Sequence, residues 1–165
     1  MDTHGSRGSA EIAERSKSPA TSRSAELERV ANRWLLELRA ALLPLNLTHA
    51  QCRLLITAAW LGSRQPGIRQ PGIRQSDIAA AANTDPVMTS EVLRTLEARA
   101  LLARAPHPTD GRAKAITVTE AGARLADRAL VIVGEVEAEF FSVGMPEFGQ
   151  LAKALKKGGR GALER

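Results

Sequence analysis

A break at residues 83–86 separates two short stretches with helical patterning, and it constrains the fold more than any other feature of the sequence. Residues 78–82 predict a short Ala-rich helix that ends at Asn83. Asp85 is suited to cap a following helix, because its carboxylate can accept hydrogen bonds from the first free backbone N–H groups, and Pro86 suits the first helical position. Two short helices joined by a tight turn predict a helix-turn-helix.

A β-hairpin is predicted directly after the second of these helices. The apolar positions of that helix are Val87, Met88, Val92, Leu93 and Leu96. Residues 101–105 and 113–118 then form two short strand-like stretches, and Ile116 and Val118 alternate with more polar positions. Residues 106–112 between them are rich in turn-forming residues, with charge near the tip. A hairpin that follows a helix-turn-helix predicts a winged helix.

Longer helices are predicted on both sides of this unit. Apolar residues recur at helical spacing over 27–42, where Pro44 ends the pattern, and again over 125–140. Thr48 and Gln51 have the spacing of a capping box at the start of a further helix. Each long apolar stripe exceeds what one small winged domain can cover, so we expect the stripes to bury each other in a homodimer. The fold class is therefore mainly α with a small β-hairpin wing.

We expect five segments along the chain. They are a disordered tail (1–23), an N-terminal dimerisation helix (24–46), a winged helix-turn-helix DNA-binding domain (47–118), C-terminal dimerisation helices (119–157) and a flexible tail (158–165). The first tail has almost no large apolar side chains, so it cannot bury enough surface to offset the entropy of ordering. The last helix of the C-terminal segment is expected to follow a break at Gly144 and Pro146.

A five-residue unit, Arg-Gln-Pro-Gly-Ile, occurs at 64–68 and 69–73, and a diverged third copy at 74–78 begins a helix. Two interpretations stay open. One is a tandem duplication tolerated in a surface loop, where added length costs little. The other is an extra basic arm. Two copies are too few for a solenoid.

Composition narrows the classes of function. The net charge of +5 favours polyanions, with nucleic acid first and an anionic membrane second. No apolar run approaches the roughly 18 residues of a membrane span, and no secretory segment is present, so the cytoplasm is the default compartment. The single cysteine, Cys52, excludes an internal disulfide and a cysteine-based zinc cluster. Cys52 lies opposite Leu47 in a hydrophobic staple, which favours a buried inert thiol over an oxidant sensor.

Enzyme motifs are missing from the sequence. There is no nucleophile motif, no Walker loop and no glycine-rich dinucleotide loop. His49 and His107 lie too far apart along the chain to indicate a metal site. We therefore expect no enzyme, no catalytic residue, no cofactor and no metal.

Five sequence blocks carry a resemblance to a known family. They are 47–51, 75–79, 85–97, 110–113 and 118–122. In this order and at this spacing they resemble the MarR family of bacterial transcriptional regulators, over roughly residues 24–157. The resemblance implies a homodimer that binds a near-palindromic site in double-stranded DNA, commonly as a repressor, in the cytoplasm and at the nucleoid when bound to DNA. It also implies a small aromatic or phenolic effector. Trp34, Leu38 and Ile56 are candidate effector contacts that the core explains equally well.

The resemblance places the second helix of the helix-turn-helix in the major groove. Thr89 and Ser90 would then meet base edges or phosphates, and Arg94 would reach guanine or the DNA backbone. The alternative is that Thr89 and Ser90 are ordinary exposed residues. Arg94 would then pair with Glu91 or Glu97.

The wing and the preceding helix supply the other contacts that the resemblance implies. Arg112 would lie in the minor groove, whose negative potential attracts arginine, and Asp110 would orient it. The alternative is a local Asp–Arg turn pair. Arg74 and Ser76 begin the first helix of the motif, where backbone N–H groups can bind a phosphate.

Two positions depart from the family pattern, and a third is unfavourable for DNA binding. Ala100 stands where the family usually has glycine, and an alanine held at positive φ costs about 1 kcal/mol. Gly111 stands where the wing usually has a second arginine. Glu91 repels phosphates unless it accepts from a cytosine amine. Glu91 and Gly111 support a second hypothesis, a winged-helix protein-interaction module with weak or no specific DNA binding.

Overall fold

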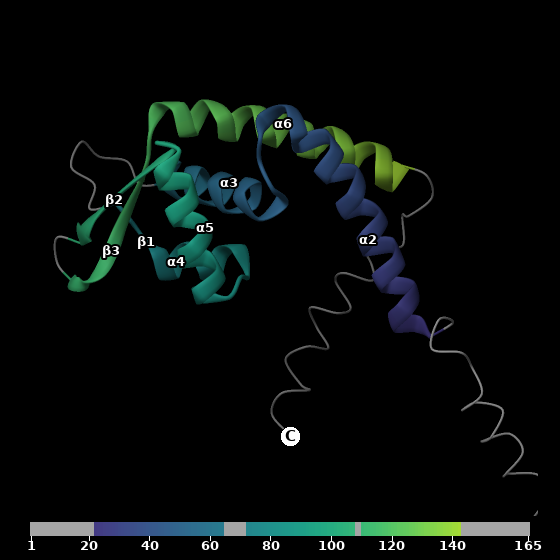
Figure 1. The fold of residues 1–165 in the computed structure, drawn as a ribbon, viewed down its shortest axis with the longest axis horizontal. Coiled ribbons are helices and arrows are strands. Elements are labelled where there is room, and N and C mark those ends of the chain that lie inside the picture. The colour runs from purple at the N-terminus through teal and green to yellow at the C-terminus, as the bar shows by residue number, and fades with distance from the viewer. Residues whose placement is uncertain (1–21, 65–71, 108–109, 143–165) are drawn as a thin grey trace, which may run out of the picture. The chain divides into compact units, whose positions relative to one another are not determined.

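The structure, a computed structural model, describes residues 22–64, 72–107 and 110–142. In chain order its elements are α2 (Arg23–Leu42), the 3-10 helix η2 (Leu43–Leu45), α3 (His49–Ser63), β1 (Ile73–Arg74), α4 (Gln75–Ala82), α5 (Pro86–Ala98), β2 (Leu102–His107), β3 (Asp110–Val118) and α6 (Glu120–Ser142) (Figure 1). Helices dominate, and the three strands form one antiparallel sheet. This order confirms the predicted winged helix-turn-helix.

The helix-turn-helix consists of α4 and α5. Asn83 ends α4 in the left-handed conformation, with φ 48°. Asp85 caps α5, because its Oδ1 accepts from the backbone N–H groups of Val87 (2.8 Å) and Met88 (3.0 Å), and Pro86 occupies the first helical turn. All three predictions for this turn are confirmed. α4 begins at Gln75, within the repeat copy at 74–78, and continues through the Ala-rich stretch 78–82.

Helix α3 lies at the centre of the winged unit and contacts α4, α5, α6 and the sheet (Figure 1). Its capping box is complete. Thr48 Oγ1 accepts from the Gln51 N–H at 3.2 Å, and the Gln51 side chain accepts from the Thr48 N–H at 3.0 Å. Leu47 and Cys52 are both buried beside this cap, as the staple predicts.

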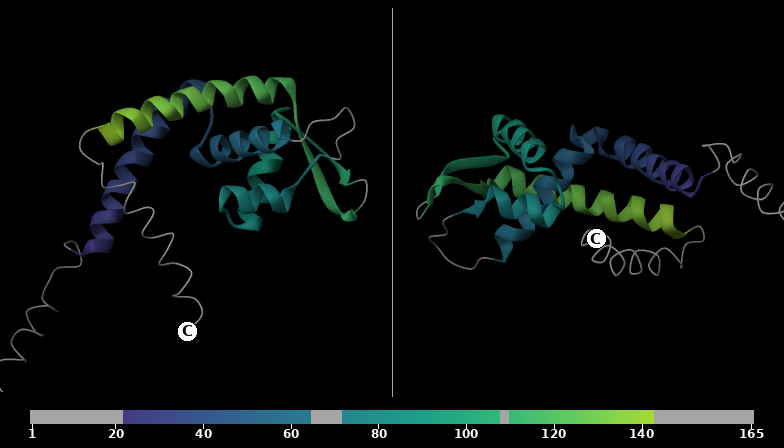
Figure 2. Two further views of the ribbon diagram at one scale, coloured as in Figure 1. Left: turned by 180° about the vertical axis from the view of Figure 1, so that it is seen from behind. Right: turned by 90° about the horizontal axis from the view of Figure 1, so that it is seen from below.

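The sheet has the strand order β1-β3-β2, and the β2–β3 hairpin projects beyond α3, α4 and α5 (Figures 1 and 2). Leu102 pairs with Val118 at the base of the hairpin, and Ile73 pairs with Ile116. The strands extend further than the predicted 101–105 and 113–118, so the backbone of residues 110–112 belongs to β3 rather than to a loop. The strand β1 was not predicted.

The core of the winged unit is aliphatic. Its largest fully buried apolar side chains include Leu54, Leu55, Ile78, Leu93, Leu96, Leu102 and Ile116. They come from α3, α4, α5, β2 and β3, so one core fixes the helix-turn-helix against the sheet.

A tight junction joins the wing to α6. Thr119 Oγ1 accepts from the Gly122 N–H at 3.0 Å and lies 3.1 Å from the Leu101 carbonyl oxygen, to which it donates. A Cβ on Gly122 would come within 2.0 Å of that carbonyl oxygen, so only glycine fits here. Ala100 precedes this junction with φ 56°, which confirms its predicted positive φ.

The chain divides into two compact units between Glu37 and Leu38, within α2. In the first unit α2 begins at Arg23, close to the expected start at 24, and Leu27 and Leu36 are exposed. In the second unit Leu38 and Leu42 are buried, and Pro44 lies in the 3-10 turn that follows the α-helix. No helix of the described ranges has the length and apolar character needed to cross a membrane.

Several predictions fall outside the described residues. They concern most of the N-terminal tail, much of the repeat before Gly72, the last helix beyond 142 and the C-terminal tail.

Candidate nucleic-acid interface

Helix α5 presents four consecutive helical-face positions outside the core, Val87, Ser90, Glu91 and Arg94, which we call the exposed α5 stripe. Their i, i+3, i+4 and i+7 spacing puts them on one side of the helix. Val87, Glu91 and Arg94 are exposed, and Ser90 is half-buried. The stripe offers an apolar group, a hydroxyl, a carboxylate and a guanidinium in a row.

Thr89 differs from its predicted role. Its side chain is 0% exposed, and its Oγ1 donates to the Asp85 carbonyl oxygen at 2.8 Å. The same hydroxyl lies 2.8 Å from Thr84 Oγ1. A hydroxyl enclosed in the turn cannot meet a base edge, so the prediction of a base or phosphate contact for Thr89 is corrected. Thr89 instead ties the first turn of α5 to the segment before it.

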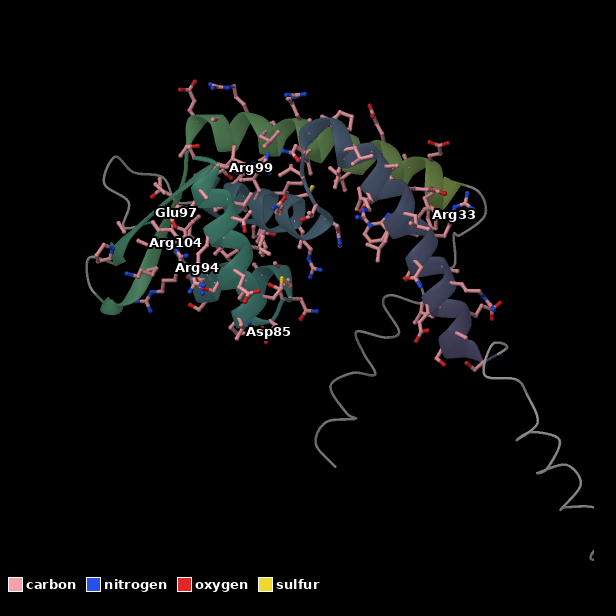
Figure 3. All side chains as sticks on the ribbon, in the orientation of Figure 1. Arg33, Asp85, Arg94, Glu97, Arg99 and Arg104 are labelled. Carbon is pink, nitrogen blue, oxygen red and sulfur yellow. The ribbon has the colours of Figure 1, made fainter. Side chains whose placement is uncertain are left out.

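Arg94 is exposed and has no ion-pair partner among the described residues. The alternative in which it pairs with Glu91 or Glu97 is therefore not observed. The Glu97 carboxylate lies instead 3.9 Å from Arg104 Nε, and Figure 3 shows Arg94, Glu97 and Arg104 together on the side of α5 that faces the wing. The Arg94 guanidinium is left available for an external acceptor.

Arg74 and Ser76 lie at the start of α4, as predicted. Arg74 occupies the cap position without a side-chain capping hydrogen bond, and it is exposed. Ser76 is also exposed, with its Oγ 3.5 Å from Asp77 Oδ1. The Asp77 carboxylate in this first turn opposes a phosphate there, while the helix dipole and the free N–H groups favour one.

The wing residues Asp110 and Arg112 have their backbones in β3, and the Asp110 Cα pairs with that of His107 across the hairpin. Their side chains lie outside the described part of the structure. The minor-groove contact of Arg112 and the orienting role of Asp110 stay predictions. Gly111 lies between them on the same strand.

Arg104 links three elements of the interface, a role that was not predicted. Its guanidinium donates to Gln75 Oε1 at 2.8 Å and lies 3.9 Å from a Glu97 carboxylate oxygen, and its side chain is 12% exposed. The wing strand is thereby held to the start of α4 and to α5. The only signal in the sequence is an arginine between two small residues of a strand, and that pattern does not reveal its partners.

Arg53 of α3 caps the end of α4, and this role too was not predicted. Its guanidinium donates to the carbonyl oxygens of Ala82 and Asn83, the latter at 3.1 Å. A cation at a helix C-terminus satisfies carbonyl groups that have no partner in the helix and interacts favourably with the helix dipole. The turn between the two helices of the motif is therefore fixed from a third helix.

Two groups on α3 have shifted pKa values. Burial, together with the nearby Arg53 charge, lowers the pKa of His49 below its usual 6.5, so the imidazole is neutral at pH 7. Burial raises the pKa of the Cys52 thiol to about 11. A protonated, 2% exposed thiol fits the prediction of an inert structural cysteine. The described residues hold no cluster of three or more potential metal ligands.

A cavity of about 330 Å³ lies where the end of α3, β1, β3 and the start of α6 meet. Its walls are mostly small and apolar side chains, including Ala59, Ile73, Ile116 and Ala123. The predicted effector contacts Trp34, Leu38 and Ile56 do not line it. Leu38 is only 1% exposed, which makes it a core residue.

Similarity to known proteins shows the family of this chain. A family model described as the MarR family matches residues 69–114, which include β1, the helix-turn-helix, β2 and the first part of β3. The HTH-type transcriptional regulator YdcH of Bacillus subtilis (strain 168) is 30% identical over 127 residues, which covers 77% of this chain and 83% of that protein. The chain belongs to the MarR family.

Solved structures of similar fold include two that were determined with a bound partner. CouR from Rhodococcus jostii RHA1, solved with p-coumaroyl-CoA, has a TM-score of 0.68 and 28% identity, covering 86% of this chain and 94% of CouR. MepR of S. aureus, solved in complex with DNA, has a TM-score of 0.68 and 26% identity, covering 82% of this chain and 95% of MepR. These matches agree with the winged-helix architecture of this MarR-family chain.

Proposed function

We propose that this protein is a sequence-specific, DNA-binding transcriptional regulator that acts as a homodimer on a near-palindromic operator in the cytoplasm. In this proposal it is a repressor whose DNA affinity falls when a small aromatic or phenolic ligand binds. Membership of the MarR family supports the regulatory role.

One observation carries the DNA-binding part of the proposal. The exposed α5 stripe is polar over most of its length and is held on a rigid frame, since Asp85 caps α5, Arg53 caps α4 and Arg104 ties both helices to the wing. A recognition helix needs such a frame, because base readout requires side chains fixed relative to the groove. MepR, of the same fold, was solved in complex with DNA.

We assign each expected DNA contact from the hydrogen-bonding groups and the charge of the side chain. Ser90 and Arg94 would meet base edges in the major groove, where arginine pairs with guanine O6 and N7. Arg112, oriented by Asp110, would lie in the minor groove, and Arg74 with Ser76 would hold a phosphate. Glu91 would accept from a cytosine amine.

Exposed apolar residues support the homodimer. Leu130 and Val131 on α6 are 56% and 61% exposed, and Leu27 and Leu36 on α2 are also exposed. Contiguous exposed apolar surface marks interaction sites, and Leu130 and Val131 are neighbours in the chain. Pairing of these helices across a two-fold axis would set two α5 helices on successive half-sites of the DNA.

The effector class rests on a structural relative. CouR was solved with p-coumaroyl-CoA, whose acyl group is phenolic. The cavity of about 330 Å³ beside β1 and α6 is a candidate location, because it adjoins both the wing and a proposed dimerisation helix.

A gel shift on the DNA upstream of the chain's own coding sequence, with excess random competitor DNA, tests the proposal. We expect a shifted band that survives the competitor. A band lost in proportion to the competitor, or no band, would instead favour the winged-helix protein-interaction module. Its supporting features are Glu91, which is exposed, and the glycine at position 111 of the wing.

A further inference from the structure

Val87 is an apolar residue of α5 that is not buried in the core. Its side chain is 68% exposed, whereas Leu93 and Leu96 of the same helix are fully buried. Pro86 beside it is also exposed, so the tip of α5 presents two neighbouring apolar side chains to the outside. Neither residue belongs to the exposed apolar surfaces of α2 and α6 that we assign to the dimer.

The tip of α5 is unsuited to a phosphate. The Asp85 carboxylate accepts from the N–H groups of Val87 and Met88, and Pro86 has no N–H to offer. The donors that would bind a phosphate at a helix N-terminus are thus largely consumed, and a negative charge already lies there. The tip therefore suits a neutral, apolar neighbour.

The side chain of Val87 is also short and branched at Cβ. Branching at Cβ restricts rotation about χ1, so few directions are open to its two methyl groups. Val87 lies at the N-terminal end of the exposed α5 stripe, where recognition helices approach base edges most closely.

The major groove offers one apolar group for such a side chain, the 5-methyl group of thymine. We propose that Val87 reads thymine in each half-site by packing its methyl groups against that 5-methyl group. This inference rests on the proposed DNA-binding function and adds a specific base preference to it. The predicted half-site therefore contains a thymine beside the bases that Ser90, Glu91 and Arg94 contact.

The test replaces thymine by deoxyuridine, which lacks only the 5-methyl group. The preferred half-site is first selected from random duplex DNA with the full-length protein, and each thymine is then replaced in turn. Binding is measured by fluorescence anisotropy. At one position in each half-site we expect the dissociation constant to rise about fourfold, and about 15-fold when both half-sites are changed, because one buried methyl group is lost from each.

The Val87→Ala variant completes a double-mutant cycle. It should bind the thymine operator more weakly than the wild type and show no further loss with deoxyuridine at that position. Alanine favours the helix, so folding is retained, and an unchanged melting temperature checks this. Arg94→Ala is the matched control from the same stripe, and it should keep the full sensitivity to deoxyuridine.

The outcomes separate the two proposals. If the wild type binds a selected operator but no thymine shows a methyl effect that Val87→Ala removes, the inference about Val87 is overturned while the DNA-binding function stands. If no sequence is enriched in the selection, the proposed function itself fails, and the inference fails with it.

Discussion

At the scale of single residues, Arg104 makes the most specific structural prediction. Arg104→Ala removes a charged donor from Gln75 at a nearly buried position, so we expect the free energy of unfolding to fall by about 1.5–3 kcal/mol in urea denaturation. Arg124→Ala is the matched control, because Arg124 pairs with Glu120 at the surface, where ion pairs contribute little. Equal losses in the two variants would contradict the linking role of Arg104.

Cys52 supplies a second prediction at this scale. Its pKa of about 11 leaves about 100-fold less thiolate at pH 8 than a thiol of the usual pKa 9.0, and burial excludes reagents as well. We expect alkylation by iodoacetamide at pH 8 to be at least about 100-fold slower in the native protein than in urea. Mass spectrometry measures the rate, and rapid labelling of the native protein would overturn the assignment of an inert thiol.

At the scale of elements, the end of α5 carries a strained residue. Ala100 has φ 56°, a conformation that glycine adopts freely, so Ala100→Gly is expected to raise the free energy of unfolding by up to about 1 kcal/mol. Ala138→Gly, at an exposed site within α6, is the control and should lower it by about 0.5–1 kcal/mol. Thermal unfolding compares the two, and the same sign in both would contradict the strain.

The helices could be predicted from the sequence because their end signals are local. Thr48 with Gln51, Asp85 with Pro86, and Thr119 each act on backbone groups a few residues away. The strand β1 could not be predicted in this way. It is two residues long, and its partner Ile116 lies in a distant part of the chain, so no local alternation indicates it.

In the candidate site, too, the residues that follow from local sequence signals were predicted, and those that depend on distant contacts were not. Ser90 and Arg94 follow from helical spacing once α5 is placed, and the structure leaves both at the surface side of that helix. Thr89 was predicted at the surface because threonine is common on both the buried and the exposed side of a short helix. Its burial is decided by the hydrogen bonds with Thr84 and Asp85. Arg53 was missed because its partners at the end of α4 come from another helix.

At the scale of the whole molecule, binding to a near-palindromic operator requires a homodimer. Obligate interfaces bury upwards of about 2,000 Å² and stay closed at low protein concentration. Light scattering at low micromolar concentration should therefore give about twice the chain mass of 17.7 kDa. Val131→Arg, which places charge on the exposed apolar surface of α6, should shift the mass towards the monomer, whereas Arg128→Ala on the same helix should not. A wild-type mass near 17.7 kDa would contradict the dimer.

In the proposed mode of binding, α5 reads the DNA sequence while the wing supplies positive charge. A salt titration of Arg94→Ala and Arg112→Ala on operator and random DNA separates these two roles. Arg94→Ala should cost about 1–3 kcal/mol on the operator and much less on random DNA. Arg112→Ala should weaken both alike and reduce the slope of log affinity against log salt by about one unit per half-site. If neither variant changed DNA binding, α5 and the wing would not contact DNA in this way, and the protein-interaction function would replace DNA binding.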